Sequence, residues 1–274
     1  MPEELDLPHQ LLSRLAMVAT LSALKAGDIL RKGFGSPMQC EEKEGRHNLV
    51  TEWDKKAELA IIEFIKSYFP GHGFLAEESG TTNGNKGEII WIIDPLDGTV
   101  NFAHNIPFFS VSIAASFQNE ILAGVVYNPL SNELFIAEKN NGAYLNGNRL
   151  HVTDINILDK AIAATGFPYN AEKNPLSCLD LFTHFVGMGM PIRRLGSAAL
   201  DLAYVAAGRF DVFWEVSLHP WDYAAGKLLI EEAGGQFTHF SGDPYTILEE
   251  GSVVATNKQI HEQVLTNIKH KIKC

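Results

Sequence analysis

The fold of this chain is most constrained by one segment, Trp91-Ile-Ile-Asp94-Pro-Leu-Asp97-Gly-Thr99. The apolar run at residues 89–93 predicts a buried strand, and Asp94-Pro95 closes it because proline cannot donate to a strand ladder. Two carboxylates, Asp94 and Asp97, then follow the carboxyl end of the strand. Open α/β sheets place their ligand sites at that end. The segment therefore predicts a sheet with a polar site beyond one of its edges.

The first half of the chain is predicted to mix helices with antiparallel strands. Apolar residues recur at helical spacing through residues 11–32, and a second helix is expected from about Asp54 to Tyr68. Residues 37–47 are polar and aperiodic, which indicates an exposed loop or hairpin. Short apolar or alternating runs, with Asn-Gly and Asn-Pro turn signals between them, indicate strands at residues 110–117, 121–127, 133–137 and 143–150.

The second half alternates between strands and helices, a rhythm typical of α/β proteins. Strands are expected at residues 161–165, 193–195 and 212–215, and helices at residues 178–186, 197–207 and 222–233. The predicted fold class is therefore α/β, with an α+β N-terminal half and an α/β C-terminal half. No Gly-, Pro- or Ser-rich linker separates the halves, so we expect one domain over residues 1–274 with subdomains of about 1–152 and 153–274.

The charge balance restricts the partners of the chain. Its 274 residues include 22 Lys and Arg against 33 Asp and Glu, a net charge of -11. This balance argues against a nucleic acid or an anionic membrane as the main partner. Three widely spaced cysteines, Cys40, Cys178 and Cys274, indicate a reducing compartment. The sequence has no leader-like start and no apolar run of about 18 residues, so we expect a cytoplasmic protein without a membrane span.

The carboxylates after the strand suit a metal site. Asp94 and Asp97 offer the oxygen ligands that Mg²⁺ prefers, and Gly98 with Thr99 places free backbone N–H groups where an anion can bind. The alternative for this segment alone is a solvated Asp-rich turn that caps a helix. Two more acids, Glu77 and Asp222, have similar alternatives, a surface carboxylate and a helix-capping residue respectively.

Three separated motifs, Glu-Glu-Ser at residues 77–79, WIIDPLDGTVNF from Trp91 and WDYAAGKLLIEEAGG from Trp221, resemble the metal-site motifs of the inositol monophosphatase family. RRLGSAALDLAYVAAGRFD from Arg193 resembles its bacterial members, and the similarity runs over about residues 10–265. The resemblance implies a layered αβαβα sandwich of the metal-dependent, lithium-sensitive sugar phosphatase type. It also implies a homodimer and two to three Mg²⁺ ions per subunit.

The resemblance assigns the expected metal ligands and catalytic residues. Glu77, Asp94 and the carbonyl of Leu96 would hold one Mg²⁺, Asp94, Asp97 and Asp222 a second, and Glu77 with water a third. Water activated by the metal would attack the phosphate, with Glu77 and a hydrogen-bonded pair, Thr99 and Asp54, as the catalytic residues.

Substrate contacts are implied in the same way. Backbone amides of Gly98 and Thr99 would hold the phosphate, next to Asp97 and Asp222. Ala198, in the segment Gly196-Ser197-Ala198, and Glu215 would bind the hydroxyls of the substrate ring. Lys43 would lie on a loop over the site. Surface ion pairing is the alternative for Lys43, and helix capping or pairing for Glu215.

The expected substrate is a small phosphorylated polyol, inositol 1-phosphate foremost. Val100 stands where the family most often has threonine, which leaves the breadth of substrates open. Fructose 1,6-bisphosphate, 3'-phosphoadenosine 5'-phosphate and histidinol phosphate are the alternatives. Some bacterial relatives are implicated in transcription complexes during ribosomal RNA synthesis, so a binding role in addition to catalysis is a further hypothesis.

Overall fold

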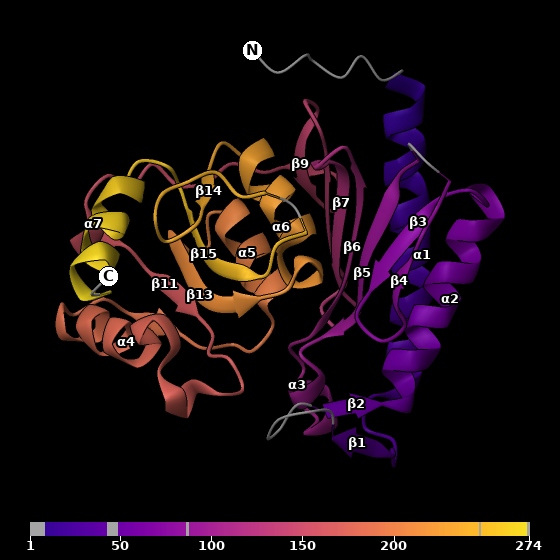
Figure 1. Ribbon diagram of the computed structural model, residues 1–274, viewed down its shortest axis with the longest axis horizontal. Coiled ribbons are helices and arrows are strands. Elements are labelled where there is room, and N and C mark those ends of the chain that lie inside the picture. The colour runs from indigo at the N-terminus through magenta and orange to yellow at the C-terminus, as the bar shows by residue number, and fades with distance from the viewer. Residues whose placement is uncertain (1–8, 43–48, 86–87, 247, 273–274) are drawn as a thin grey trace.

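The computed structural model describes residues 9–42, 49–85, 88–246 and 248–272, and it arranges them in five layers (Figure 1). A helix pair covers an eight-stranded sheet, a second helix pair lies between that sheet and a five-stranded sheet, and a third helix pair covers the far side. The αβαβα sandwich expected from the sequence is confirmed.

The larger sheet contains most of the first half of the chain. Its strands lie in the order β10-β9-β8-β7-β6-β5-β3-β4. Only the β3–β5 pair is parallel, and the other neighbours are antiparallel. Their bounds are β3 Gly73–Ala76, β4 Gly80–Thr82, β5 Ile90–Asp97, β6 Ser110–Phe117, β7 Glu120–Asn128, β8 Glu133–Glu138, β9 Gly142–Leu145 and β10 Asn148–Arg149.

Two helices, α1 (His9–Gly33) and α2 (Glu52–Tyr68), cover the outer face of this sheet. The apolar residues that recur at helical spacing in the sequence form the buried face of α1, where Leu15, Ala23 and Leu30 are fully buried. A short hairpin of β1 (Cys40–Glu42) and β2 (Leu49–Thr51) precedes α2. The hairpin predicted as one alternative for residues 37–47 is thus present, although residues 43–48 lie outside the described residues.

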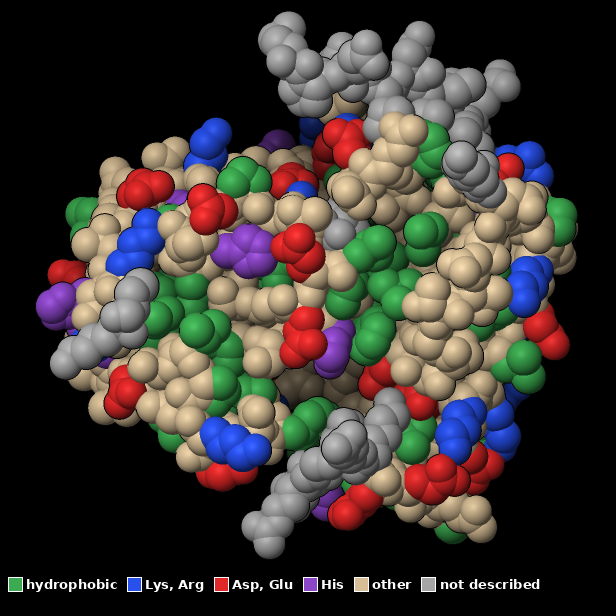
Figure 2. Space-filling model, in the orientation of Figure 1, with side chains coloured by type: hydrophobic (Ala, Val, Ile, Leu, Met, Phe, Trp, Pro, Cys, Tyr) green, Lys and Arg blue, Asp and Glu red, His purple; other side chains and the backbone are tan. Residues whose placement is uncertain are grey.

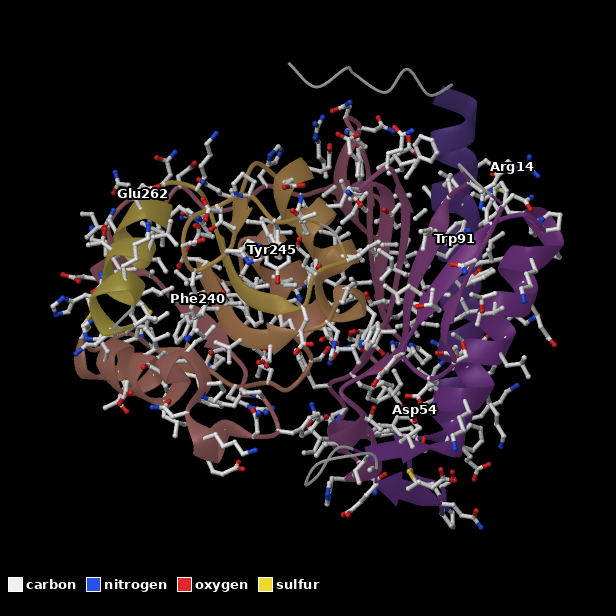
Figure 3. The ribbon with its side chains drawn as sticks, viewed as in Figure 1. Arg14, Asp54, Trp91, Phe240, Tyr245 and Glu262 are labelled. Atoms are coloured by element: carbon white, nitrogen blue, oxygen red, sulfur yellow. The ribbon has the colours of Figure 1, made fainter. Side chains whose placement is uncertain are left out.

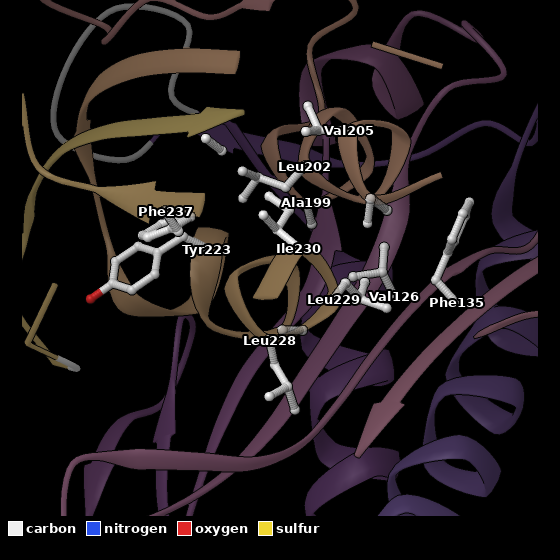
Figure 4. Packing of buried hydrophobic residues seen from close by; sticks show 14 of the residues in the cluster. Val126, Phe135, Ala199, Leu202, Val205, Tyr223, Leu228, Leu229, Ile230 and Phe237 are labelled. Atoms are coloured by element: carbon white, nitrogen blue, oxygen red, sulfur yellow. The ribbon is translucent and has the colours of Figure 1, made fainter. Parts of the chain in front are cut away.

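The middle layer consists of α5 (Ala198–Ala206) and α6 (Pro220–Glu232). Small residues let these helices approach closely, since a Cβ added at Gly226 would lie 2.6 Å from the Cβ of Leu202. Figure 4 shows the apolar core here, with Val126 of β7 beside Leu229 of α6. This core joins both sheets and fixes the position of the two helix starts.

The smaller sheet has the order β12-β11-β13-β15-β14, and α4 and α7 cover its outer face. The bounds are β11 Ala163–Thr165, β12 Ile192–Arg193, β13 Val212–Leu218, β14 Gln236–Thr238, β15 Gly251–Thr256, α4 Cys178–Gly187 and α7 His261–Lys271. One short helix, α3 (Thr99–Ala103), follows β5, and three-residue 3-10 turns lie at Leu158–Lys160, Ala171–Lys173 and Pro175–Ser177.

The structure corrects two strand predictions. β5 does not end at residue 93 but continues to Asp97 through a bulge, because β6 pairs Ser112 with Asp94 and Ser110 with Asp97. The extra residue on β5 lets the strand accommodate Pro95. The strand expected at residues 143–150 is two strands, β9 and β10. Asn146 and Gly147 both have positive φ, the geometry of a tight hairpin turn.

Five elements were missed in the sequence, namely the short strands β3, β4, β14 and β15 and the 11-residue helix α7. Each of these strands has six residues or fewer, too few for a clear period. Across the described part of the chain, none of the helices combines the length and the apolar character that a bilayer crossing requires.

Candidate functional site

Glu77 and Asp94 are brought together by the parallel pair β3 and β5. The register pairs Ala76 with Ile93, so Glu77 and Asp94 are the next residues on neighbouring strands. The Glu77 N–H donates to the Ile93 carbonyl over 3.1 Å, which extends the ladder to the point where Glu77 leaves it. The end of β3 thus places Glu77 beside Asp94 of β5, close to the carboxyl end of the strand where the sequence predicted Asp94 and Asp97.

Asp94 and Asp97 lie on either side of the β5 bulge. Asp94 Oδ1 accepts a hydrogen bond from the Leu96 N–H over 2.9 Å, which fixes the turn between them. Asp97 Oδ2 accepts two hydrogen bonds from the start of α5, one from the Ser197 hydroxyl over 2.6 Å and one from the Ala199 N–H over 2.8 Å. The Asp97 carboxylate therefore connects the large sheet to the middle helix layer.

Asp222 reaches the same region from the start of α6. Its Oδ2 accepts the His219 N–H over 2.7 Å as part of a capping box, which is the alternative role weighed for this residue in the sequence. The Ser112 hydroxyl of β6 donates to the Trp221 carbonyl over 3.1 Å and holds the start of α6 against the sheet. Asp222 therefore caps α6 and also lies near the other acids of the site.

The electrostatics of these acids show that they share one space. Burial raises the pKa of Asp94 well above its usual range, and the charges of Glu77, Asp97 and Asp222 add to this shift. Burial likewise raises the pKa of Asp222 well above its usual range, followed by the charges of Asp97 and Glu77. Burial also raises the pKa of Asp97 to about 6, against the hydrogen bonds from Ser197 and Ala199.

These four acids form the carboxylate cluster, Glu77, Asp94, Asp97 and Asp222. Its donor set fits a hard divalent cation, because it consists of oxygens only and its mutual repulsion is what a cation would offset. Among the described residues, no group of three or more His, Cys, Asp or Glu side chains is arranged to hold a metal ion by itself. A cation here would therefore need further oxygens, or rotation of side chains whose second oxygen is bound to the backbone.

Thr99 and Asp54 form the hydrogen-bonded pair expected from the sequence. Thr99 Oγ1 lies 3.0 Å from Asp54 Oδ1 and 3.0 Å from the Leu96 carbonyl, both acceptors for its single proton. Asp54 Oδ2 accepts from both the N–H and the hydroxyl of Thr51, so Asp54 also completes the capping box of α2. Burial raises the pKa of Asp54 to about 6 although the Thr51 hydrogen bonds oppose the shift. Figure 3 shows Asp54 at the start of α2, near α3.

Gly98 permits the close approach between β5, α3 and the loop before α5. Its φ is +96°, and an added Cβ would lie 3.1 Å from the Gly196 carbonyl and 3.2 Å from the Phe108 carbonyl. The Asn101 amide donates to the Leu195 carbonyl over 2.8 Å and holds this loop from the other side. The expected phosphate-binding turn is therefore tightly packed and in the αL conformation that glycine favours.

Glu215 lies on β13 of the smaller sheet, next to Gly166, which follows the last residue of β11. Its carboxylate is packed so tightly against Gly166 that a Cβ there would lie 2.2 Å from either oxygen. Burial raises its pKa to about 8, with an opposing effect from Arg194 and a contribution from the charge of Asp97. No residue in the described ranges donates a hydrogen bond to it, so its oxygens are available for a ligand.

Ala198 is the first residue of α5, and its N–H faces the Asp97 carboxylate. The contact of this backbone with the substrate ring stays a prediction, and its neighbour among the described residues is Asp97. Lys43, the expected loop residue, lies outside the described residues.

Three residues near the cluster were missed in the sequence. Ser197 was noted only for its backbone. Asp201 of α5 is buried with Oδ1 unpartnered, and an acid on the inward side of an apolar helix was the signal that could have found it. Tyr169 is 53% exposed, and desolvation of its phenol, followed by the charges of Glu77 and Asp222, raises its pKa to about 12. No periodicity marks Tyr169, because it lies in a loop.

On the face in Figure 2, acidic side chains lie beside the hollow between the two halves of the molecule. A sequence model of the inositol monophosphatase family matches residues 11–273. The chain is 45% identical over 249 residues to an inositol-1-monophosphatase of Rhizobium meliloti (90% of this chain, 93% of the relative). It is 41% identical over 256 residues to Nus factor SuhB of Escherichia coli K12 (93% and 96%).

A solved structure agrees with these relatives. The crystal structure of extragenic suppressor protein suhB from Bartonella henselae has a TM-score of 0.88 and 40% identity, and the comparison covers 93% of this chain and 98% of that one. The match spans both sheets and the whole carboxylate cluster, so the chain belongs to the inositol monophosphatase family and is a phosphoric monoester hydrolase.

Proposed function

We propose that this protein hydrolyses a small phosphorylated polyol, inositol 1-phosphate foremost, with Mg²⁺ as its cofactor. The observation that supports this most is the carboxylate cluster, in which β3, β5 and α6 deliver four mutually repelling acids to one buried region. A chain keeps such a cluster only where a cation or a proton offsets the repulsion.

The residues of the cluster would serve two main cation positions and a looser third. Glu77, Asp94 and the Leu96 carbonyl would hold one Mg²⁺, and Asp94, Asp97 and Asp222 a second, with Glu77 and water at a looser third. When bound, Mg²⁺ would supply Lewis-acid stabilisation of the phosphate charge and a more acidic water. In each aspartate of the cluster, one carboxylate oxygen accepts a backbone N–H. This bond holds the side chain in place and limits the reorganisation that cation binding requires.

Thr99 and Asp54 would orient and deprotonate the attacking water. With its own proton donated to Asp54 Oδ1, Thr99 Oγ1 presents lone pairs that can accept a hydrogen bond from the water. Asp54 has a raised pKa of about 6. This value is closer to neutral pH, and a general base works best when its pKa is near the operating pH. A proton would then pass from water through Thr99 Oγ1 to Asp54.

The phosphate and the polyol would occupy the space between the two sheets. The first N–H groups of α3, at Gly98 and Thr99, lack acceptors within the helix and would donate to phosphate oxygens. Asp222 and Asp97 would lie beside the leaving oxygen, and Glu215 with the start of α5 would face the ring hydroxyls. Glu215 would thereby select a polyol over a plain phosphate ester.

Phosphate release across substrates tests the proposal. Inositol 1-phosphate, fructose 1,6-bisphosphate, 3'-phosphoadenosine 5'-phosphate and histidinol phosphate are compared with Mg²⁺, with chelator, and with added Ca²⁺ or Li⁺. We expect inositol 1-phosphate to have the highest kcat/KM, chelator to abolish release, and Ca²⁺ to inhibit because it does not enforce octahedral geometry. Full turnover in chelator would refute a metal mechanism, and a higher kcat/KM on another ester would reassign the substrate.

A binding role is a second candidate, favoured by the 41% identity to relatives named Nus factor SuhB. Because the family carboxylates are all present in this chain, such a role would add to catalysis and not replace it. Co-purification of transcription proteins with the tagged chain, compared with a tagged control of similar charge, would test it. We further propose a cytoplasmic homodimer.

A further inference from the structure

We propose that Ser197 is a positioning residue for Asp97. Its hydroxyl, at the start of α5, orients the Asp97 carboxylate for a divalent cation and connects the middle helix layer to the carboxylate cluster. This inference rests on the proposed function, because it takes Asp97 to be a Mg²⁺ ligand.

The contact is short, buried and made across a hundred residues of sequence. Ser197 Oγ lies 2.6 Å from Asp97 Oδ2, and the Ala199 N–H donates to the same oxygen over 2.8 Å. Ser197 is 1% exposed and Asp97 is 9% exposed, so water does not readily replace either donor. The Ala198 N–H also faces this carboxylate. Three neighbouring groups at the start of α5 therefore hold Asp97, two of them through Oδ2.

A second serine fixes the direction of the Ser197 hydroxyl. Ser110 Oγ lies 3.2 Å from Ser197 Oγ, and Ser110 is the cross-strand partner of Asp97 in β6. An ionised carboxylate only accepts, so the Ser197 proton goes to Asp97 and the Ser110 hydroxyl donates to Ser197. Ser110, Ser197 and Asp97 thus form a closed link between β5, β6 and α5.

Helix capping is the competing explanation. Ser197 is the N-cap of α5, and its Oγ accepts from the Leu200 N–H over a long 3.4 Å. Loss of a cap alone would lower the melting temperature and leave the affinity for Mg²⁺ unchanged. Loss of positioning would weaken Mg²⁺ binding, since outer hydrogen bonds to a metal ligand typically contribute 10- to 100-fold in affinity or activity.

The test compares Ser197→Ala with Ser197→Thr, which keeps the hydroxyl, and with Ser252→Ala as a matched control. Ser252 is a buried serine whose hydroxyl accepts the Phe240 N–H, and it lies on β15 of the smaller sheet. For each purified protein, calorimetric titration gives the Kd for Mg²⁺, phosphate release gives the half-activating Mg²⁺ concentration, and melting in chelator reports folding.

We expect Ser197→Ala to raise both the Kd and the half-activating concentration of Mg²⁺ by about 10-fold or more, with a smaller loss of turnover at saturating Mg²⁺. Ser197→Thr should stay within about threefold of the wild type, and Ser252→Ala should melt earlier with an unchanged Kd. A folded Ser197→Ala protein with the wild-type Kd would overturn the proposal, and so would a folded Ser197→Thr protein as weak as Ser197→Ala.

Ser110→Ala keeps the proposal testable if Ser197→Ala does not fold. This variant removes the donor that orients the Ser197 hydroxyl, so it should weaken Mg²⁺ binding in the same direction by a smaller factor, and an unchanged Kd would overturn the link. Wild-type protein that neither binds Mg²⁺ in calorimetry nor depends on it for phosphate release would refute the proposed function itself, whatever the variants do.

Discussion

Glu215→Gln separates substrate selection from metal binding. Glu215 accepts no hydrogen bond from the described residues, and burial raises its pKa to about 8. At pH 7 the ligand-free protein therefore holds it mainly as a neutral acid. Glutamine keeps its size and an acceptor oxygen but cannot ionise. The variant thus removes the ability to ionise without opening a cavity beside Gly166.

The stability change follows from the pKa. The pKa of Glu215 lies at about 8 in the folded protein and near 4.5 in the unfolded chain, so the unfolded chain loses its proton first as pH rises. The stability of the wild type should therefore fall between pH 4.5 and 8. At pH 7 the cost is about 3 kcal/mol, at roughly 1.4 kcal/mol for each pH unit above 4.5. Glutamine avoids this cost. We expect the variant to be about 2 kcal/mol more stable at pH 7, after allowing for partial exposure, and to melt roughly 5 °C higher.

The activity should change on one class of substrate only. Inositol 1-phosphate offers ring hydroxyls to Glu215, whereas an aryl phosphate offers none. We expect kcat/KM to fall about 10- to 100-fold on inositol 1-phosphate and to change less than about threefold on the aryl phosphate. Phosphate release on both substrates at saturating Mg²⁺ measures the ratio. An equal loss on both substrates would mean that Glu215 supports the metal site, and a lower melting temperature would refute the burial argument.

Three further predictions concern the metal site, a buried histidine and the assembly. Asp97→Asn should lower phosphate release by about 100-fold or more, because the leaving oxygen loses electrostatic support, yet melt no lower than the wild type in chelator; near-normal turnover would remove Asp97 from the mechanism. His261 is held neutral between the Thr238 and Thr256 hydroxyls, and burial lowers its pKa to about 4. The contribution of neutral His261 to the free energy of unfolding is complete above pH 6.5 and is lost as pH falls towards 4. Urea unfolding should therefore show about 2 kcal/mol less stability at pH 4 than at pH 7 from this residue. His261→Gln should reduce this dependence of stability on pH. Light scattering at micromolar concentration should give the mass of a homodimer, and a monomer mass would contradict that proposal.

Long, periodic elements were predictable from the sequence, whereas short ones were predicted in some places, as for β11 and β12, and missed in others, as for β3 and β4. The α1 helix was expected over residues 11–32 and spans His9–Gly33, because a continuous apolar stripe has one explanation at that length. By contrast, β3 is only four residues long, and its existence depends on pairing with β5. The sequence therefore identified Glu77 by resemblance alone, whereas the structure supplies the physical reason for its position beside Asp94.

The site was predictable in its acids but not in the groups that orient them. Asp94 and Asp97 follow a recognisable strand, so local sequence places them at the end of a sheet. Ser197 and Tyr169 come from segments about 70 to 100 residues further along, and no local pattern connects a loop residue to a distant carboxylate. Such contacts depend on how the two sheets pack against the middle helices, which periodicity does not encode.

The helix-capping roles weighed for Asp222 and for the Asp94–Asp97 turn are compatible with a role in the site, and the structure adds a third such role for Asp54. Asp54 completes the capping box of α2, Asp222 that of α6, and Asp97 accepts from the start of α5. In each case one carboxylate oxygen, Oδ2, is bound to the N-terminal backbone or cap residue of a helix. In Asp54 the other oxygen, Oδ1, accepts the Thr99 hydroxyl.

The different partners of the two carboxylate oxygens explain how acids that repel one another stay buried and oriented. Helix N-terminal N–H groups stabilise the ionised form of each carboxylate, which burial and neighbouring charges disfavour. The same bonds restrict the side-chain torsion and so limit the directions in which the remaining oxygen can point. Removing a capping donor should therefore disturb cation binding through orientation. Removing a carboxylate charge should disturb it through electrostatics, with the melting temperature in chelator lowered in the first case and preserved or raised in the second.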